Sequence, residues 1–277
     1  MPFFAPADDP GANFPDLLRR LGLDAAPAST PLGTTADVGA LGVPHATTCV
    51  ALRYDAGVVM AGDRRATSGN LISHRTMEKV VQADRHSGVA IAGSAGPAME
   101  MIKMFQLQLE HYEKVEGAAL SLDGKANQLS AMVRSNLPAA MQGMVVVPIF
   151  AGYDLLRDCG RLWDFDATGG RYEERDFVAT GSGSLHAGTV IKVGYRRDLS
   201  RDEAIDLALR SLWEAADADS ATGGPDLRRG IFPVAAAIDA DGWAGLDDTE
   251  LAARSDRIIA ELPAASGAEA TAEVDAS

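Results

Sequence analysis

The order of strand-like and helix-like segments between residues 48 and 262 constrains the fold more than any other feature of this sequence. Runs rich in β-branched and apolar residues indicate strands, and apolar residues that recur every three or four positions indicate helices. Strands are predicted at 48–54, 58–61, 89–92, 144–153, 161–166, 171–178 and 231–238. Helices are predicted at 95–116, 125–142, 185–194, 201–218 and 248–262. This succession favours an α/β layered domain in which helices cover the outer faces of two packed sheets.

Two of the helices carry local signals of their ends. Ser200 and Glu203 have the spacing of a capping box, which satisfies two backbone donors at the start of the 201–218 helix. Pro138 lacks a backbone N–H, so it predicts a kink or an early break in the 125–142 segment.

The two ends of the chain differ in amino-acid composition from the middle. Residues 1–46 are rich in Pro, Gly, Ala and Ser, apart from one short amphipathic helix predicted at 14–23, and we interpret them as a mostly flexible leader. Residues 263–277 have the same low complexity and are predicted to be a disordered tail. A single folded domain is therefore predicted at 47–262.

Charge and cysteine content narrow the class of protein. The net charge of −14 argues against a nucleic-acid partner. Two cysteines, Cys49 and Cys159, do not form the disulfide framework of a small secreted domain, so a cytoplasmic location is expected. No signal peptide is recognised, and the longest apolar run, at 144–153, is shorter than the ~18 residues that favour a membrane span. No membrane partner is expected.

The threonine pair at the start of the first strand has two interpretations. Thr47 could simply open a strand, as β-branched residues often do. Alternatively, Thr47 could be a nucleophile, because a threonine hydroxyl needs a nearby base and a free α-amine on the same residue supplies one. That amine becomes free only if the bond between Ala46 and Thr47 is cut, which would explain the leader. The similar pair Thr34-Thr35 precedes no strand and no charged cluster, and is expected to be inert.

Six motifs then resemble those of one known family. They are "TTCVALRYDAGVVMAGDRRATSGN" (47–70), "MEKV" (77–80), "AGSAG" (92–96), "QLEHYEKVEG" (108–117), "GSGS" (181–184) and "DADSATGGPD" (217–226). Together they resemble the β-type subunits of proteasomes, most closely those of the actinobacterial 20S proteasome, over residues 43–262. The resemblance implies a four-layer αββα sandwich of the N-terminal-nucleophile hydrolase type.

The resemblance also implies roles for individual residues. Thr47 matches the nucleophile, and its freed α-amine matches the general base. Lys79 matches a lysine whose positive charge favours the deprotonated threonine oxygen, and Asp63 matches the carboxylate that positions that lysine. Gly93 matches the residue whose N–H faces the oxyanion of the tetrahedral intermediate. For an arbitrary Asp and Lys, the alternative interpretation is an ordinary ion pair.

Three further residues match a group that surrounds the α-amine and relays protons. They are Ser182, Asp219 and Thr222, although the family more generally has serine at the position of Thr222.

A substrate pocket follows from the same comparison of motifs. Thr67 matches a residue that pairs with the peptide backbone of the substrate. The side chains that match the pocket are all apolar, which predicts cleavage after bulky hydrophobic residues: Ala66, Met77, Val81, Ile91, Ala95 and Met99. Ordinary core packing is the alternative for each of these side chains.

The function predicted from the resemblance is the catalytic β subunit of a 20S proteasome, a threonine endopeptidase activated by self-cleavage between Ala46 and Thr47. The implied partners are proteasome α subunits, other β subunits in heptameric rings, a ring-shaped ATPase, and unfolded or ubiquitin-like-tagged proteins. Two alternatives are the peptidase subunit of the simpler two-component bacterial protease, whose members are shorter, and a non-catalytic ring scaffold.

Neither a metal nor a cofactor is predicted. The five histidines have no paired ligand spacing, and neither GxSxG nor a nucleotide-binding glycine motif occurs.

Overall fold

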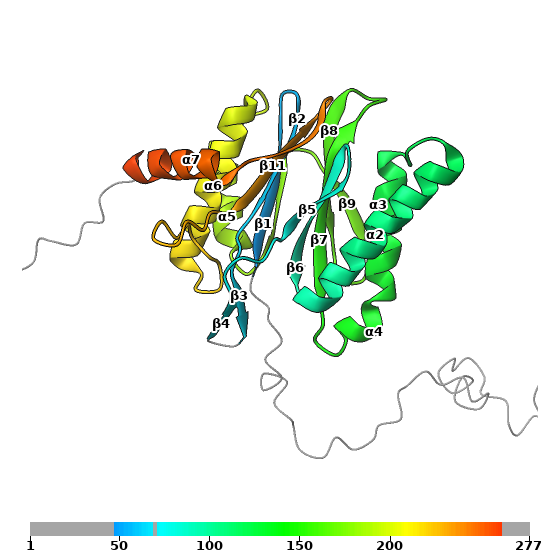
Figure 1. The fold of residues 1–277 in the computed structure, drawn as a ribbon, viewed down its shortest axis with the longest axis horizontal. Coiled ribbons are helices and arrows are strands. Elements are labelled where there is room, and N and C mark those ends of the chain that lie inside the picture. Colours follow the sequence, from blue (N-terminus) through cyan, green and yellow to red (C-terminus); the bar gives the residue numbers. More distant parts are fainter. Residues whose placement is uncertain (1–46, 69–70, 262–277) are drawn as a thin grey trace, which may run out of the picture. The chain divides into compact units, whose positions relative to one another are not determined.

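The computed structural model describes residues 47–68 and 71–261. In this part of the chain, two five-stranded antiparallel sheets lie face to face, with helices on both outer sides (Figure 1). This arrangement confirms the predicted α/β layered sandwich. The predicted leader with its helix at 14–23 and the predicted tail at 263–277 lie outside the described residues.

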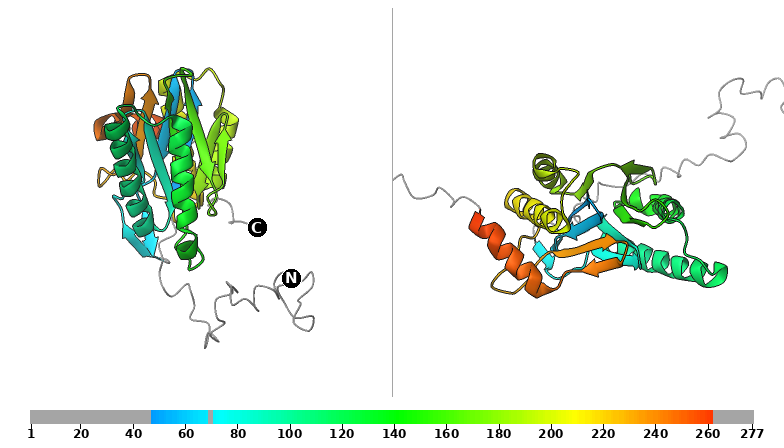
Figure 2. Two further views of the ribbon diagram at one scale, coloured as in Figure 1. Left: turned by 90° about the vertical axis from the view of Figure 1, so that its right-hand side faces the viewer. Right: turned by 90° about the horizontal axis from the view of Figure 1, so that it is seen from above.

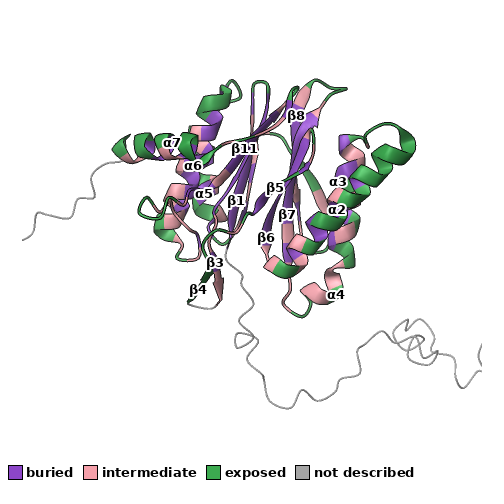
Figure 3. Cartoon of the chain, viewed as in Figure 1, coloured by how far each residue is buried: buried purple, intermediate pink, exposed green. Residues whose placement is uncertain are grey.

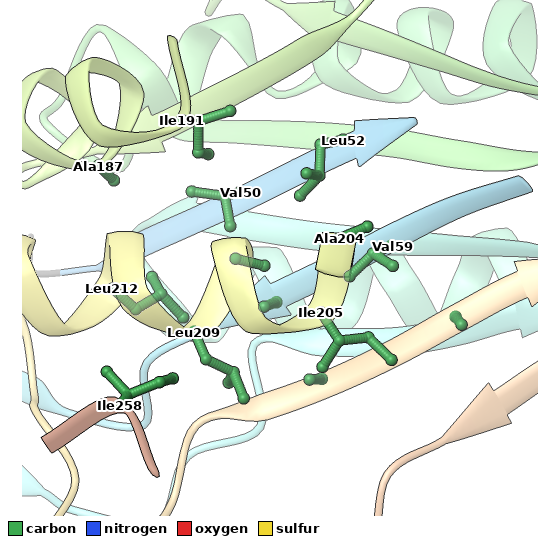
Figure 4. Packing of buried hydrophobic residues seen from close by; sticks show 14 of the residues in the cluster. Val50, Leu52, Val59, Ala187, Ile191, Ala204, Ile205, Leu209, Leu212 and Ile258 are labelled. Atoms are coloured by element: carbon green, nitrogen blue, oxygen red, sulfur yellow. The ribbon is translucent and has the colours of Figure 1, made fainter. Parts of the chain in front are cut away.

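The first sheet begins with the strand that follows Thr47. Its strands, in spatial order, are β10 (Phe177–Gly181), β1 (Thr48–Tyr54), β2 (Gly57–Gly62), β11 (Val234–Asp239) and β12 (Gly242–Gly245). Its outer face is covered by α5 (Ser184–Gly194), α6 (Arg201–Ala218) and α7 (Asp248–Glu261). Val50 and Val59 pack there against Ile191 and Leu209, as Figure 4 shows.

The second sheet carries the other pair of long helices. Its strands, in spatial order, are β5 (Val80–Asp84), β6 (Ser87–Gly93), β7 (Val146–Asp154), β8 (Cys159–Phe165) and β9 (Arg171–Glu174). Helices α2 (Ala95–Glu116) and α3 (Leu122–Ser135) cover its outer face through a core that contains Phe105, Phe150 and Trp163. None of the helices in the described segments combines the length and apolarity that crossing a bilayer requires.

A third apolar core lies between the two sheets. It joins Ala51 and Met60 of the first sheet to Ile149 and Leu162 of the second, all of them inaccessible to solvent. The inward-facing surfaces of both sheets are therefore buried, as the purple strands of Figure 3 show, and the view from above in Figure 2 shows helices on both sides of them. Apolar residues on both faces of each sheet explain why the strands read as nearly continuous hydrophobic runs.

In each half of the sandwich, a buried arginine forms ion pairs that connect an outer helix to neighbouring elements. Arg161 on β8 binds Asp123 at the start of α3, Asp154 at the end of β7 and Glu173 on β9, at 2.7 to 3.0 Å. Its guanidinium also lies 4.6 Å from the centre of the Trp163 ring.

In the other half, Arg254 on the outer helix α7 has a similar set of partners. It binds Asp202 and Asp206 on α6 and Glu250 on its own helix, at 2.5 to 3.0 Å. Each guanidinium is more than nine-tenths buried, and three carboxylates offset the cost of removing it from water.

Some predicted elements were wrong or missed. The single strand predicted at 171–178 is two strands in different sheets, because the chain crosses from β9 to β10 at Arg175-Asp176. The predicted break at Pro138 is confirmed: α3 ends before Asn136, and a short α4 (Leu137–Ala140) follows. The hairpin of β3 (Ala66–Ser68) and β4 (Leu71–His74), and the strands β5 and β12, were missed.

Candidate active site

A buried ion pair forms the centre of the candidate site. Asp63 lies just beyond β2, and Lys79 lies just before β5, so the pair joins one sheet to the other. Lys79 Nζ donates to Asp63 Oδ1 at 2.8 Å, and both side chains are fully inaccessible to solvent. Lys79 also donates to the carbonyl oxygen of Arg65. A charged pair at this depth is maintained only when hydrogen bonds compensate for the lost solvation.

The Asp63 carboxylate receives those bonds from the main chain. Oδ1 accepts the Thr48 N–H at 2.9 Å in addition to the lysine. Oδ2 accepts the N–H of Arg65 at 2.8 Å and the N–H of Gly223 at 2.9 Å. Four donors therefore fix the carboxylate, and through it the position of the Lys79 ammonium.

A second polar group forms where helix α6 ends. Asp219, the C-cap residue of α6, accepts the Ser182 hydroxyl at 2.5 Å and the Thr222 hydroxyl at 2.6 Å, both on Oδ2. Partial burial raises the pKa of Asp219, but hydrogen bonds from the two hydroxyls and from the N–H of Ala221 outweigh that effect, so its pKa lies below the ordinary value. The carboxylate is ionised at neutral pH and can orient protons on both hydroxyls.

Thr48 connects the two groups. Its hydroxyl lies 2.6 Å from that of Thr222 and accepts the Gly183 N–H at 2.9 Å. Its own N–H binds Asp63. The residue next to Thr47 is therefore fixed from both sides, which positions the start of β1 relative to both carboxylates.

Thr47 itself is held through its backbone. Its carbonyl oxygen accepts the Ser182 N–H at 2.9 Å, and the residue is 4% exposed. Gly181 makes this approach possible: its φ is +99°, and a Cβ there would lie 1.7 Å from the Thr47 oxygen. Ala46, the other side of the predicted cleavage point, lies outside the described residues.

The turn from β6 into α2 contains Gly93 and an unusual serine. Gly93 has φ +106°, and a Cβ there would lie 2.2 Å from the Val145 oxygen. Ser94 is the N-cap of α2, yet its hydroxyl makes no capping bond, and it is buried without a hydrogen-bond partner in the described part of the chain. The third helical residue is Pro97, which has no N–H and so cannot donate a hydrogen bond to the hydroxyl of the N-cap residue. This turn therefore leaves one buried hydroxyl unsatisfied.

The sequence is similar to those of known proteins. A family model described as "Proteasome subunit" matches residues 43–226, which is more than half of the chain. The chain belongs to the proteasome subunit family. The resemblance predicted from the motifs is thereby confirmed, and similarity to proteasome β subunits implies a peptidase.

Individual members of the proteasome family extend the assignment to the β type. The chain is 55% identical over 262 residues to "Proteasome subunit beta" of Acidimicrobium ferrooxidans, covering 95% of this chain and 93% of that protein. It is 57% identical over 212 residues to the protein of that name from Streptomyces griseus subsp. griseus, covering 76% and 75%. The protein of that name from Acidothermus cellulolyticus is 54% identical over 222 residues, covering 79% and 77%.

The residues predicted to form a substrate pocket divide into two sets. Met77, Val81, Ile91 and Met99 pack into one apolar cluster between the second sheet and α2. Ala66 is buried on β3, and Thr67 next to it and Ala95 at the start of α2 are half-buried. The structure brings the first four together, and the pocket stays a prediction.

Several contacts in this proteasome subunit were missed from the sequence. They come from Thr48, Arg65, Gly183 and Gly223, and all but the Thr48 hydroxyl are made by backbone groups. A backbone donor has no signature in a residue type, although the glycines in "GSGS" and "TGG" indicate close backbone approach. In the described residues, no group of three or more His, Cys, Asp or Glu side chains could hold a metal ion.

Proposed function

We propose that this chain is the catalytic β subunit of a 20S proteasome core particle, acting as a threonine endopeptidase with Thr47 as nucleophile. The observation that carries the proposal is the fully buried Asp63–Lys79 pair, bound to the backbone of Thr48 beside the nucleophile. A desolvated lysine charge has a high cost in a purely structural role, and a positive charge near a hydroxyl favours its oxyanion.

Peptide hydrolysis would proceed by acyl transfer to Thr47. The hydroxyl oxygen attacks the scissile carbonyl carbon, and its proton goes to the free α-amine of the same residue, whose reference pKa is ~7.7–8.0. The Gly93 N–H stabilises the resulting oxyanion. The amine product leaves with the proton, and an ester to Thr47 remains. Water then attacks the ester, which releases the acid product and restores the hydroxyl.

The group around Asp219 would keep the α-amine in the proton-accepting orientation. Asp219 binds the hydroxyls of Ser182 and Thr222, and Ser182 also binds the Thr47 carbonyl through its N–H. We assign these three residues to orienting the amine. Thr222 in place of the serine usual in the family retains the hydroxyl that the role needs.

The same hydroxyl would also remove the leader. Thr47 attacks the carbonyl of Ala46, the small side chain of which permits the approach, and the ester formed by this shift is hydrolysed to expose the α-amine. The boundaries 1–46 for the leader, 47–262 for the hydrolase domain and 263–277 for the tail belong to this proposal.

Substrates and partners follow from membership of the family. We assign the chain to β rings of seven subunits stacked between α rings, with an ATPase ring that feeds in unfolded proteins, some carrying a ubiquitin-like tag. The apolar side chains Met77, Val81, Ile91 and Met99 favour cleavage after bulky hydrophobic residues. Fluorogenic peptides that are cut faster after acidic or basic residues would contradict this preference.

The central experiment compares Thr47→Ala with Thr34→Ala in the assembled particle. The first substitution removes the nucleophile and should abolish both leader removal and peptide hydrolysis, whereas the second alters the equivalent residue of the other threonine pair and should change neither. Mass spectrometry measures the chain start, and an electrophilic peptide inhibitor should label the mature protein at Thr47. A wild-type particle that keeps its leader and stays unlabelled would indicate the scaffold instead.

A further inference from the structure

A small pocket is lined by Arg65 and Gly223, the two residues whose N–H groups bind Oδ2 of Asp63. Its internal volume is only about 30 Å³, and it is lined by Arg64, Arg65 and Arg75 on one side and by Gly223, Gly224, Asp226 and the apolar residues 231–233 on the other. A Cβ at Gly223 would lie 2.8 Å from that of Arg65, so the two walls can approach only because glycine stands there.

The charges that line this pocket are mostly positive. Asp226 supplies the carboxylate among the lining residues, and it already accepts a hydrogen bond from Arg229 at 2.6 Å. The Arg64 guanidinium lies 3.9 Å from the exposed Asp248, and its Nε is buried without a hydrogen-bond partner in the described residues. Arg65 donates to the neutral carbonyl of Ser220. Three arginines therefore line the pocket together with a single carboxylate, in a chain whose net charge is −14.

Arg75 is the member of this group best placed to receive a ligand. It lies just after β4, is exposed, and has no ion pair within the described residues. Its charge reaches the pocket, since it helps to lower the pKa of Asp226 after the larger effect of the hydrogen bond from Arg229.

We propose that this pocket, defined by Arg64, Arg65, Arg75, Gly223 and Gly224, binds a small tetrahedral oxyanion such as inorganic phosphate. Planar guanidinium groups bind such oxygens through paired, charge-assisted hydrogen bonds. The pocket is far smaller than the sites that hold drug-sized ligands, so it excludes a large molecule and leaves room only for a small ion.

The ligand would be linked to the candidate active site through two backbone contacts. Arg65 and Gly223, from opposite walls, both donate their N–H to Asp63 Oδ2, and Arg65 also accepts from Lys79. An oxyanion that draws these walls together holds the carboxylate and the lysine in the geometry described above. This part of the inference rests on the proposed function, and we expect peptide hydrolysis to be faster in phosphate than in chloride.

The test uses the assembled particle with phosphate, sulfate and chloride salts at one ionic strength. Calorimetric titration measures phosphate binding, and thermal unfolding measures stabilisation. Arg75→Gln should weaken phosphate binding about tenfold, the effect expected for one charge-assisted hydrogen bond. Arg228→Gln makes the same charge change at an exposed arginine outside the pocket and should leave binding unchanged. Circular dichroism checks that both variants fold. If Arg75→Gln does not fold, Arg64→Gln takes its place in the comparison.

Each outcome has one meaning. Binding that is lost in Arg75→Gln and kept in Arg228→Gln supports the pocket. Absent binding, or equal binding in all variants, overturns it. Binding without a change in hydrolysis overturns the link to Asp63. Phosphate binding is measured independently of activity, so the two proposals can fail separately. If the wild-type particle binds phosphate but hydrolyses no peptide, the proposed function is contradicted and the pocket is still supported. If hydrolysis depends on Thr47 but phosphate does not bind, the pocket is overturned and the proposed function is still supported.

Discussion

At the scale of single residues, Ser94 and Ser130 form a natural comparison. Both are buried serines, but the Ser130 hydroxyl donates to the Gly169 carbonyl at 2.7 Å, whereas the Ser94 hydroxyl has no partner among the described residues. A buried hydroxyl without a hydrogen bond lowers stability, and one with a bond contributes to it.

We therefore expect Ser94→Ala to leave the free energy of unfolding unchanged or raise it by up to about 1 kcal/mol. Ser130→Ala should lower it by about 1 kcal/mol. Urea denaturation of the two variants measures the difference. A loss in Ser94→Ala as large as that in Ser130→Ala would mean that the hydroxyl has a partner after all, such as an ordered water.

The side chains that contact one another in the candidate site could be predicted from the sequence, because motifs preserve residue types. Asp63 and Lys79 were paired in advance, and the structure places them 2.8 Å apart. Asp219 was grouped in advance with Ser182 and Thr222, and hydrogen bonds join all three. The role of Thr48 could not be predicted, since its hydroxyl contacts Thr222, which lies 174 positions further along the chain.

At the scale of elements, the start of α2 depends on the backbone conformation of one glycine. Gly93 has a positive φ and no room for a Cβ, whereas Gly96, three positions later in the first turn of α2, has no atom within 4 Å of the point that a Cβ would occupy. Alanine is favoured over glycine inside a helix by about 1 kcal/mol.

Gly93→Ala should accordingly destabilise the protein, because the backbone must leave the left-handed region or collide with Val145. Gly96→Ala should be neutral or stabilising. The midpoint of thermal unfolding measures both. If the two alanine variants unfold at the same temperature, the conformation of this turn does not constrain the helix start.

Elements were predictable where a long apolar stripe or a cap marks them. Helix α6, announced by Ser200 and Glu203, begins and ends where predicted, and its capping box is formed. The segment 171–178 was misread because both of its halves favour strand, while the sheet that each half joins is decided by tertiary contacts. The β3–β4 hairpin was missed because β3 has only three residues and β4, with four, is exposed throughout, so neither strand has an apolar pattern long enough to recognise.

At the scale of the whole molecule, the two buried arginines predict how stability depends on pH. Hydrogen bonds from Arg161 lower the pKa of Asp123 and Glu173, and those from Arg254 lower the pKa of Asp202, in each case against the opposing effect of burial. Since these carboxyls have a lower pKa in the folded than in the unfolded protein, their contribution to stability is present above about pH 4 and is lost as the pH falls through the folded values.

We expect Arg161→Met to lower stability at pH 7 and to weaken its decline between about pH 5 and pH 2, because the carboxylates then lose the partner that depresses their pKa. Arg157→Met is the matched control: Arg157 contacts the same Asp123 and Asp154 but is exposed, so its removal should have little effect. Urea denaturation across this pH range measures both variants. Parallel pH curves for wild type and Arg161→Met would contradict the role of this arginine.

The layered architecture was predicted because strand groups and helix pairs alternate along the chain, and the two helix-covered sheets agree with it. The sequence could not reveal the ion pairs of the two buried arginines, since the carboxylates that bind each arginine come from separate elements. Asp123 and Arg161, for example, are 38 positions apart.

Three of the four donors to Asp63 are backbone N–H groups, which every residue except proline possesses. A survey that exchanges one amino acid for another at position 65 would therefore test the side chain and leave this backbone hydrogen bond intact. Replacing that amide with an ester by chemical synthesis would delete the donor and keep the side chain. Mutational tolerance at this position is thus no measure of its importance.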